Sequence, residues 1–498
     1  MKIRTRFAPS PTGFLHVGGL RTALFAYLFA KKHGGEFILR IEDTDRERLV
    51  DGAIQNIIEA LQWAGFTPDE GVTMIDGSIT EVGQYGPYVQ SERKEKGIYN
   101  TYAQQLIDVG HAYYAFDTPE ELDVLRADQQ QQQLPPRYNR LSMTNSIVLS
   151  KQRVDDLLAA HTPFVIRMNV PVGETTFTDM VRGDITIQNS EIDDQILIKS
   201  DGYPTYHFAV VVDDHLMQIS HVIRAEEWIP STPKHILLYQ MFGWDMPQFA
   251  HLPLLINEQK QKLSKRHGDV SVQDFKEGGF MPQALVNFVS FLGWNPGTEE
   301  EIFSLSGLEK AFDMKQVSKS SAVFDRQKLT WYNQQYIRKL DKESLYAEVK
   351  PFLVNLGLIL VNDPDQDDFA KQAILLEQER SGNFKELAEN IAFLFVKEIV
   401  IEQKLLVWKK STLEDAKQKL TQISSVLTDI PDEEWNATHL EEVIIDWIKD
   451  NQFGVGDVLW PVRVALSGKQ NSPGPFDIMS VLKKQKTLER LQKASHIT

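Results

Sequence analysis

Residues 4–41 are RTRFAPSPTGFLHVGGLRTALFAYLFAKKHGGEFILRI. Arg4 to Ala8 predicts a short strand, and the prolines and the glycine at 9–13 predict a turn. We expect a helix over Gly18 to Lys32, where apolar residues recur at helical spacing, and a second strand over Glu36 to Ile41. A strand, a helix and a strand in so short a stretch form a βαβ unit, which predicts a parallel sheet.

The helix of this unit begins with residues suited to phosphate. His16, Gly18 and Gly19 lie at its start, where small residues let a ligand approach the backbone and the helix dipole favours negative charge. An imidazole there can donate to phosphate oxygens as charge develops on them. The sequence has neither Gly-x-Gly-x-x-Gly nor a Gly-Lys-Ser/Thr loop, so neither the dinucleotide fingerprint nor the P-loop applies. The alternative is a helix start whose His and Gly only make a turn.

A second segment with phosphate chemistry lies far along the chain, at residues 262–268, with the sequence KLSKRHG. Lys262 and Lys265 are compact charges suited to the β- and γ-phosphates of a nucleotide and to departing pyrophosphate. A loop of this kind can swing onto a polyphosphate. Taken alone, the segment is equally well described as a solvated basic loop.

Length and composition predict a globular protein with several domains. The chain has 498 residues, which corresponds to about three or four domains. It has no run of about 18 apolar residues and no leader pattern, so we expect a cytoplasmic protein without a membrane span. Cysteine is absent, which excludes disulfides and thiolate zinc sites. A net charge of −16 argues against coating of nucleic acid by bulk charge and predicts that the basic residues gather on one face.

The remaining sequence divides into parts that differ in composition and hydrophobic pattern. We expect a Rossmann-like catalytic domain at 1–104 and 200–270, an inserted α+β domain at 105–199, a helical domain at 271–328 and an α-helical domain at 329–498. The predicted fold class is therefore α/β in the N-terminal half, with a Rossmann-like parallel sheet, and all-α in the C-terminal half. A glutamine run at Gln129–Gln133 predicts a solvated helix end or loop.

A continuous apolar run at Tyr206–Asp214 ends in two carboxylates. We expect a buried parallel strand whose end faces a ligand crevice. Asp213, Asp214 and His215 are therefore candidate nucleotide or metal contacts, with a purely structural role as the alternative.

Charged and polar groups stand at the expected strand ends. Arg6 and Glu42 end the first two strands, Tyr206 starts the returning strand, and Arg224 follows it. Strand ends of an open parallel sheet gather around one crevice. Two guanidinium groups and a phenol can clamp a carboxylate, and Glu42 can hold an ammonium group, a combination that matches glutamate. For any one of these charges the alternative is a surface salt bridge worth about 0–1 kcal/mol.

The two phosphate segments together resemble the nucleotide motifs of class I aminoacyl-tRNA synthetases, and the residues between them resemble those of bacterial glutamyl-tRNA synthetases. Residues 8–19 are similar to the family's His-x-Gly-x motif, with Gly19 where many class I enzymes have His. Residues 262–266 are similar to Lys-Met-Ser-Lys-Ser, with Leu263 for Met and Arg266 for the last Ser. The resemblance covers nearly the whole chain and is firmest over residues 4–48, 203–268 and 317–333.

The resemblance implies a role for each matching residue. It implies catalytic roles for His16, Lys262 and Lys265. The implied ATP-binding residues are His16, Gly18, Gly19, Lys262, Leu263, Ser264, Lys265 and Arg266. The implied glutamate-binding residues are Arg6, Ala8, Ser10, Glu42, Tyr206 and Arg224. Lys319 and Arg380 are candidate tRNA contacts.

The activity that the resemblance implies is glutamate–tRNA ligation. ATP and L-glutamate would give glutamyl-adenylate, Mg²⁺ would arrive with ATP, and the glutamyl group would pass to the terminal adenosine of tRNA(Glu). The inserted domain would receive the acceptor end, the helical domain at 271–328 would contact the tRNA stem, and the α-helical domain at 329–498 would bind the anticodon. The enzyme would be a monomer. Some glutamyl enzymes hold zinc on cysteines of the insert. Here Ala115, Asp117 and Ser142 stand at those positions, so we predict no zinc.

Three alternatives stay open at this stage. The first is an enzyme that also charges tRNA(Gln). The second is a catalytically silent paralogue that binds RNA or a partner. Such a paralogue is expected to lose His16 or the lysines of residues 262–268, and this sequence retains them. The third is another transferase on the same nucleotide fold, in which the long helical C-terminal half has no place.

Overall fold

The computed structural model describes residues 2–263, 270–361 and 363–497. The chain forms two compact units: unit 1 is Met1–Phe275 with Leu285–Arg326, and unit 2 is Lys276–Ala284 with Gln327–Thr498. Unit 1 combines strands with helices, and the described part of unit 2 is helical. The predicted fold class is thereby confirmed.

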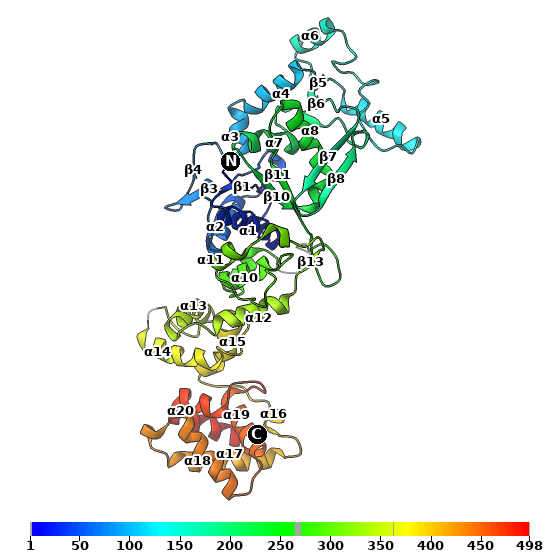
Figure 1. Ribbon diagram of the computed structural model, residues 1–498. Helices are drawn as coiled ribbons and strands as arrows, with labels where there is room; N and C mark the ends of the chain where they lie inside the picture. Colours follow the sequence, from blue (N-terminus) through cyan, green and yellow to red (C-terminus); the bar gives the residue numbers. More distant parts are fainter. Residues whose placement is uncertain (1, 264–269, 362, 498) are drawn as a thin grey trace. The chain divides into compact units, whose positions relative to one another are not determined.

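Unit 1 is built on one large sheet (Figure 1). Among the described residues, eight strands join in the order β4-β3-β2-β1-β10-β11-β7-β8. Neighbouring strands from β3 to β7 are parallel, whereas β3 with β4 and β7 with β8 form antiparallel pairs at the two edges. The strands are β1 (Arg4–Phe7), β2 (Glu36–Leu39), β3 (Glu70–Ile75), β4 (Ser78–Val82), β7 (Glu174–Asp179), β8 (Gly183–Gln188), β10 (His221–Ala225) and β11 (Gln248–Leu252). The parallel sheet is therefore confirmed in its centre.

The predicted βαβ unit forms, with its limits shifted by one or two residues. Helix α1 (Val17–Lys32) connects β1 to β2, and these strands pair in parallel with Thr5 opposite Phe37. The apolar positions Leu20, Leu24 and Leu28 of α1 are completely buried. Because the chain leaves the carboxyl end of β1 and enters the start of α1, the helix start and the strand ends lie at one edge of the sheet.

The strand predicted over residues 206–214 is wrong, because this run is helix α7 (Tyr206–Leu216). Its apolar residues are buried on every side by contacts with α4 (Ile98–Asp108), α8 (Thr232–Phe242) and β9 (Ile196–Ile198). A helix without a polar face has the same continuous apolar pattern as a buried strand. The strand that returns to the sheet beside β1 is β10.

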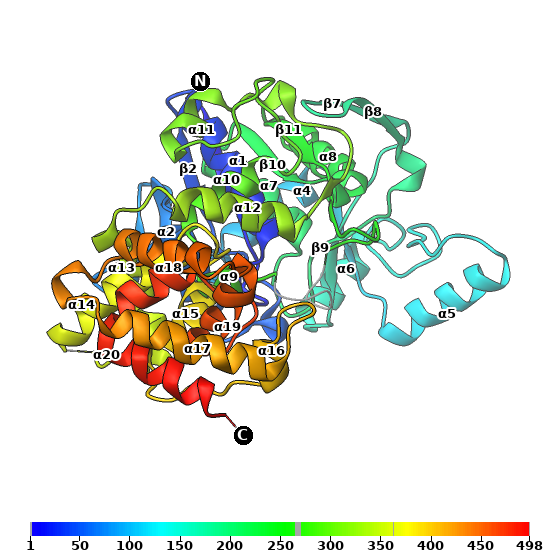
Figure 2. The same ribbon diagram turned by 90° about the horizontal axis from the view of Figure 1, so that it is seen from below.

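Residues 105–199, predicted as an inserted domain, contribute to two sheets. Strands β5 (Ala112–Ala115), β6 (Val165–Met168) and β9 form a separate antiparallel sheet, whereas β7 and β8 extend the large one. Helix α5 (Pro119–Gln131) projects from unit 1 (Figure 2). The glutamine run ends this helix and is mostly exposed, as predicted. The domain boundaries themselves stay a prediction.

The other described elements are mostly helices. Those up to the junction are η1 (Arg46–Arg48), α2 (Ala53–Trp63), α3 (Gln90–Glu95), α6 (Lys151–Ala159), η2 (Asn189–Glu191), η3 (Glu226–Ser231), β12 (Leu255–Ile256), α9 (Val272–Glu277), α10 (Pro282–Ser290), α11 (Leu305–Ala311), η5 (Met314–Gln316), β13 (Ala322–Val323) and α12 (Arg326–Ile337). The described helices that follow α12, all in unit 2, are α13 (Lys342–Asn355), α14 (Pro364–Ala373), η6 (Ile374–Leu376), α15 (Phe384–Phe395), α16 (Gln403–Leu406), α17 (Leu413–Thr428), η7 (Asp432–Glu434), α18 (Ala437–Asp450), α19 (Val455–Ser467) and α20 (Pro475–Ser495). No described helix has the length and apolar character that crossing a membrane requires.

Candidate active site

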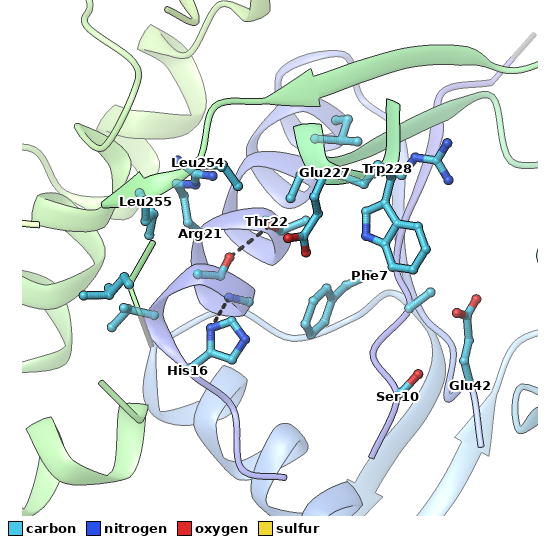
Figure 3. Close-up of a pocket in the computed structure, with 18 of the residues that line it drawn as sticks. Phe7, Ser10, His16, Arg21, Thr22, Glu42, Glu227, Trp228, Leu254 and Leu255 are labelled. Carbon is cyan, nitrogen blue, oxygen red and sulfur yellow. Dashed lines mark hydrogen bonds between the residues drawn. The ribbon is translucent and has the colours of Figure 1, made fainter. Parts of the chain in front are cut away.

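A cavity of about 960 Å³ lies where the strand ends of unit 1 meet the start of α1 (Figure 3). Every described residue that the sequence predicted to bind glutamate or ATP lines it. These residues are Arg6, Ala8, Ser10, His16, Gly18, Gly19, Glu42, Tyr206, Arg224, Lys262 and Leu263. Ser264, Lys265 and Arg266 lie outside the described residues. The structure therefore brings the predicted positions together, and their individual roles stay predictions.

Two parts of this cavity differ in chemistry. We call one the lysine end, which consists of His16, Gly18, Gly19, Lys262 and Leu263. We call the other the arginine end, which consists of Arg6, Glu42, Tyr206 and Arg224. In Figure 3, Phe7 lies between His16 of the first group and Glu42 of the second.

His16 caps the start of α1 at the lysine end. Its Nδ1 accepts a hydrogen bond from the backbone N–H of Gly19 at 3.2 Å. This bond leaves the proton of the neutral imidazole on Nε2, the nitrogen that can then donate to a phosphate oxygen. A Cβ atom at Gly19 would lie 2.8 Å from Cδ1 of Leu15, so a larger residue there would require the Leu15 side chain to shift.

The described residues on either side of residues 264–269 are anchored beside the helix start. The N–H of Leu263 donates to the carbonyl of Leu255, and the N–H of Val17 donates to the carbonyl of Val270, both at 2.9 Å. Lys262 forms an ion pair with Glu227, and its side chain is 63% exposed. An exposed pair of this kind is weak, so Lys262 can exchange Glu227 for a bound phosphate at small cost.

The arginine end contains buried ion pairs. Arg6 on β1 is 4% exposed, and its Nε donates to Asp214 at 3.1 Å. Arg40 donates to Asp214 at 2.7 Å and to Glu42 at 2.9 Å. Burial alone would raise the pKa of Asp214, but the guanidinium groups of Arg6 and Arg40 hold that pKa below its usual value. The network fixes Arg6 and Glu42, and the terminal Nη atoms of Arg6 make no hydrogen bond to another described residue.

Arg224 is a buried cation without a carboxylate in contact with it. It lies on β10 beside β1 and is 5% exposed. It donates to His251 at 3.1 Å, to His235 at 3.2 Å and to Thr232 at 2.9 Å. Within the described part of the chain, Arg224 forms no salt bridge. Because a buried unpaired charge is costly, this arrangement predicts an anionic ligand.

Tyr206 and Trp228 complete the arginine end. Tyr206 starts α7, and its ring centroid lies 4.6 Å from that of Trp228. Burial raises the pKa of Tyr206, so the phenol stays protonated and can donate a hydrogen bond. Trp228 was not predicted as a site residue, because an aromatic residue four positions after Arg224 has no distinctive sequence signal.

Asp213, Asp214 and His215 do not line the cavity, so their prediction as nucleotide or metal contacts is wrong. Asp213 is completely buried and accepts hydrogen bonds from Arg93 at 2.6 Å and from Gln90 at 2.8 Å. The ring of His215 stacks on Trp244 at 3.7 Å. The physical reason is that these residues end a buried helix and not a strand whose end faces the crevice.

The predictions on metal and RNA contacts are not decided by the geometry. Among the residues that the structure describes, no group of three or more His, Cys, Asp or Glu could hold a metal ion. Asp117, at one of the positions compared with zinc cysteines, accepts a hydrogen bond from the Tyr138 hydroxyl at 2.5 Å. Lys319 donates to the carbonyl of Arg182 at 3.4 Å. Arg380 donates to the carbonyl of Ser472 at 2.7 Å. Both cationic side chains are exposed, and their RNA contacts stay predictions.

Comparison with known proteins places this cavity in a family. Residues 2–331 match the catalytic domain of tRNA synthetases class I (E and Q), and residues 344–495 match an anticodon binding domain. The chain is 43% identical to a glutamate–tRNA ligase of Finegoldia magna, over 99% of each protein. It is 44% identical to one of Clostridioides difficile, over 99% of this chain and 98% of the relative.

Solved structures agree with this assignment over the whole chain. A crystal structure of a glutamate tRNA ligase from Elizabethkingia meningosepticum, in complex with its amino acid, superimposes with a TM-score of 0.88 at 38% identity, covering 99% of each chain. Glutamate-tRNA synthetase from Elizabethkingia anophelis gives a TM-score of 0.87 at 38% identity, covering 100% of each chain. The chain therefore belongs to the class I tRNA synthetases of the glutamate and glutamine (E and Q) family.

Proposed function

We propose that this protein is a glutamate–tRNA ligase, which activates L-glutamate with ATP and transfers it to tRNA(Glu) in translation. The observation that supports this most strongly is that one cavity holds the arginine end and the lysine end together. The first offers cationic donors and a carboxylate to an amino acid with an acidic side chain. The second offers a helix start and a lysine to a polyphosphate. The relatives over the full length carry the same activity in their names.

Glutamate fits the arginine end in one orientation. The Nη groups of Arg6 and Arg224 and the hydroxyl of Tyr206 bind the side-chain carboxylate by charge-assisted hydrogen bonds. Glu42, which Arg40 holds in place, binds the α-ammonium group, and Ala8 and Ser10 line the same wall. The α-carboxylate then points along the cavity toward the lysine end.

The activation step needs positioning and charge stabilisation, and no protein nucleophile. An α-carboxylate oxygen attacks the α-phosphorus of ATP, and the bond from that phosphorus to the oxygen bridging the α- and β-phosphates breaks. Glutamyl-adenylate forms, and pyrophosphate leaves with its electron pair. Nε2–H of His16 and the ammonium group of Lys262 stabilise the charge that develops on the phosphates. Mg²⁺ enters bound to the ATP phosphates as part of the substrate.

The second step transfers the activated amino acid to RNA. A ribose hydroxyl of the terminal adenosine attacks the acyl carbon of glutamyl-adenylate, and its proton passes to a phosphate oxygen of the adenylate. The bond from the acyl carbon to the phosphate oxygen breaks, and AMP leaves. Lys319 in unit 1 and Arg380 in unit 2 are the proposed tRNA contacts, because both present exposed cationic side chains. The match of residues 344–495 to an anticodon binding domain supports a role for unit 2 in choosing the tRNA.

Glutamine is rejected by the same charges that bind glutamate. A neutral amide leaves at least one buried guanidinium group without its anion, and a site built on such polar contacts can discriminate by about 10⁴–10⁵. Selection of the amino acid therefore resides in unit 1. Whether the enzyme also charges tRNA(Gln) depends on the separate selection of the tRNA.

Aminoacylation of purified tRNA transcripts tests the proposal. Labelled glutamate, ATP and Mg²⁺ are incubated with the protein and with tRNA(Glu), tRNA(Gln) or an unrelated tRNA, and acid-precipitable label is counted. We expect charging of tRNA(Glu) and none of the unrelated tRNA. Charging of tRNA(Gln) as well would identify the non-discriminating form. Folded protein that charges no tRNA would overturn the proposal in favour of a silent RNA-binding paralogue.

The predicted monomeric state is tested separately, and the cytoplasmic location stays a prediction. Sedimentation equilibrium of the purified chain should give a mass near 56.9 kDa for a monomer. A mass near twice that value would replace the monomer with a dimer.

A further inference from the structure

Three neighbouring strands place a series of hydrogen-bonded polar side chains behind the cavity. In the register of β10 and β11, Arg224 lies opposite His251, and in that of β11 and β7, Phe249 lies opposite Asp179. Positions 249 and 251 of a strand project to the same face. The register therefore places Arg224, His251 and Asp179 on one face of the sheet.

The hydrogen bonds along this series of side chains have a fixed direction. Arg224 can only donate, so Nε2 of His251 accepts from Nε of Arg224 at 3.1 Å. The ring proton of His251 is then on Nδ1, which donates to Oδ2 of Asp179 at 2.6 Å. Both side chains of the His251–Asp179 pair are completely buried. Asp179 therefore selects the tautomer in which His251 can accept from Arg224.

The second carboxylate oxygen of Asp179 is held by the backbone. Oδ1 accepts from the N–H groups of Val181 at 3.0 Å, Arg182 at 2.9 Å and His251 at 3.3 Å. These bonds fix the carboxylate at the turn that joins β7 to β8, so Oδ2 keeps its direction toward His251.

We propose that Asp179 is a positioning residue for recognition of the substrate carboxylate, acting through His251 on Arg224. This inference rests on the proposed role of Arg224 in binding glutamate. A carboxylate in direct contact with Arg224 would neutralise it and compete with the substrate. With one imidazole between them, Asp179 orients the guanidinium group and leaves two Nη–H groups for the ligand.

On its opposite side, Arg224 also contacts an imidazole. His235 Nδ1 accepts from Nη1 of Arg224, and its Nε2 faces Nδ1 of His207 at 3.0 Å. Burial, together with the charge of Arg224, holds the pKa of His235 well below its usual value, so this imidazole is neutral. Neutral groups on both sides keep the positive charge of Arg224 available to an anion.

The variant Asp179→Asn tests whether Asp179 acts through His251 on Arg224, with little change in side-chain shape. The three backbone donors fix the amide oxygen at the place of Oδ1. The amide NH₂ then faces Nδ1 of His251, which must accept, and the ring proton moves to Nε2. Nε2 can then no longer accept from Nε–H of Arg224, and donates instead to the Thr232 hydroxyl at 3.2 Å. The matched control is Asp184→Asn on β8, whose carboxylate accepts only from the exposed Thr178 hydroxyl at 2.6 Å among the described residues.

The measurement is glutamate-dependent ATP–pyrophosphate exchange in the presence of tRNA(Glu), with KM determined separately for glutamate and ATP. For Asp179→Asn we expect the KM for glutamate to rise about 10- to 100-fold, as for loss of partners behind a ligand-binding group, while the KM for ATP changes less than about twofold. Asp184→Asn should match the wild type. A merely structural role would instead lower thermal stability without separating the two KM values.

A double-variant cycle with His251→Leu identifies the route of the effect. If Asp179 acts through His251, adding Asp179→Asn to His251→Leu should raise the KM for glutamate no further. Additive effects, or an unchanged KM for glutamate in Asp179→Asn, would overturn the inference. Wild-type protein without glutamate-dependent exchange would overturn the proposed function instead, so the two failures are distinguishable.

Discussion

The two ends of the cavity are built on opposite principles. Arg6, Glu42 and Arg224 at the arginine end are each 4–5% exposed and are fixed by hydrogen bonds. Lys262 at the lysine end is 63% exposed and is held by one ion pair with Glu227. An amino acid that must be distinguished from its amide requires desolvated, fixed charges. A polyphosphate that must leave as pyrophosphate is better served by groups that can change partners.

This difference predicts which kinetic constant each end controls. Changes at the arginine end should raise the KM for glutamate and weaken discrimination, because they remove binding that exists before the reaction. Changes at the lysine end should lower kcat, because they remove stabilisation of charge that develops during it.

The largest effect is expected for Arg224→Ala. Removal of Arg224 takes away one of the two guanidinium groups proposed to bind the substrate carboxylate, and leaves His235, His251 and Thr232 without their donor. We expect kcat/KM for glutamate in pyrophosphate exchange to fall by about 10⁴. Arg126→Ala, which removes an exposed arginine of α5, is the control and should have wild-type kinetics. A decrease of less than tenfold for Arg224→Ala would remove this residue from glutamate recognition.

A smaller effect on a different constant is expected for Lys262→Ala. Loss of one charge at the phosphates should lower kcat of exchange by about 10², with little change in the KM for glutamate. Thermal unfolding should be unchanged, because the side chain is exposed. Lys260→Ala, in the same segment but not lining the cavity, is the matched control. An equal rise in the KM for glutamate would contradict the division between the two ends.

A modest decrease in the KM for ATP is expected when Lys262 is freed from its ion pair with Glu227. Glu227→Gln removes the ion pair that holds Lys262 before ATP binds. Because an exposed pair is worth about 0–1 kcal/mol, the KM for ATP should fall by up to about fivefold. Steady-state exchange at varied ATP measures this change. A higher KM for ATP would mean that Glu227 itself contributes to nucleotide binding.

The smallest effect concerns the stability of the folded protein at acid pH. Burial lowers the pKa of His207, the partner of His235, from 6.5 to about 4. The folded state binds this proton less well than the unfolded state, so stability is complete above pH 6.5 and decreases as the pH falls toward about 4. His207→Gln should remove about 1 kcal/mol of the stability difference between pH 7.5 and 5.5, measured by denaturant unfolding. An unchanged pH dependence would show that the pKa of His207 is the same in the folded and unfolded states.

Local sequence patterns were sufficient for part of this account. The βαβ unit was predictable because its helix and strand periods and its Pro and Gly stops are all contained in residues 4–41. The strand ends then indicated Arg6 and Glu42, and the two phosphate segments indicated His16 and Lys262. All four line the cavity.

The supporting residues could not be found in this way, because their partners are distant in the chain. Arg40 reaches Asp214, and Arg224 reaches His251 and through it Asp179, only after the strands have assembled. The apolar run of α7 was mistaken for a strand because burial on every side removes the helical period. Sequence therefore identified the groups proposed to contact ligand more readily than the groups that hold them in place.

The most direct test of the central claim is amino-acid-dependent pyrophosphate exchange by the wild-type protein, with glutamate and glutamine compared at equal concentration in the presence of tRNA(Glu). We expect exchange with glutamate and exchange at least about 10³-fold weaker with glutamine, because the buried cations of the arginine end require an anion. Equal exchange with both amino acids would contradict it, and so would exchange with glutamine alone.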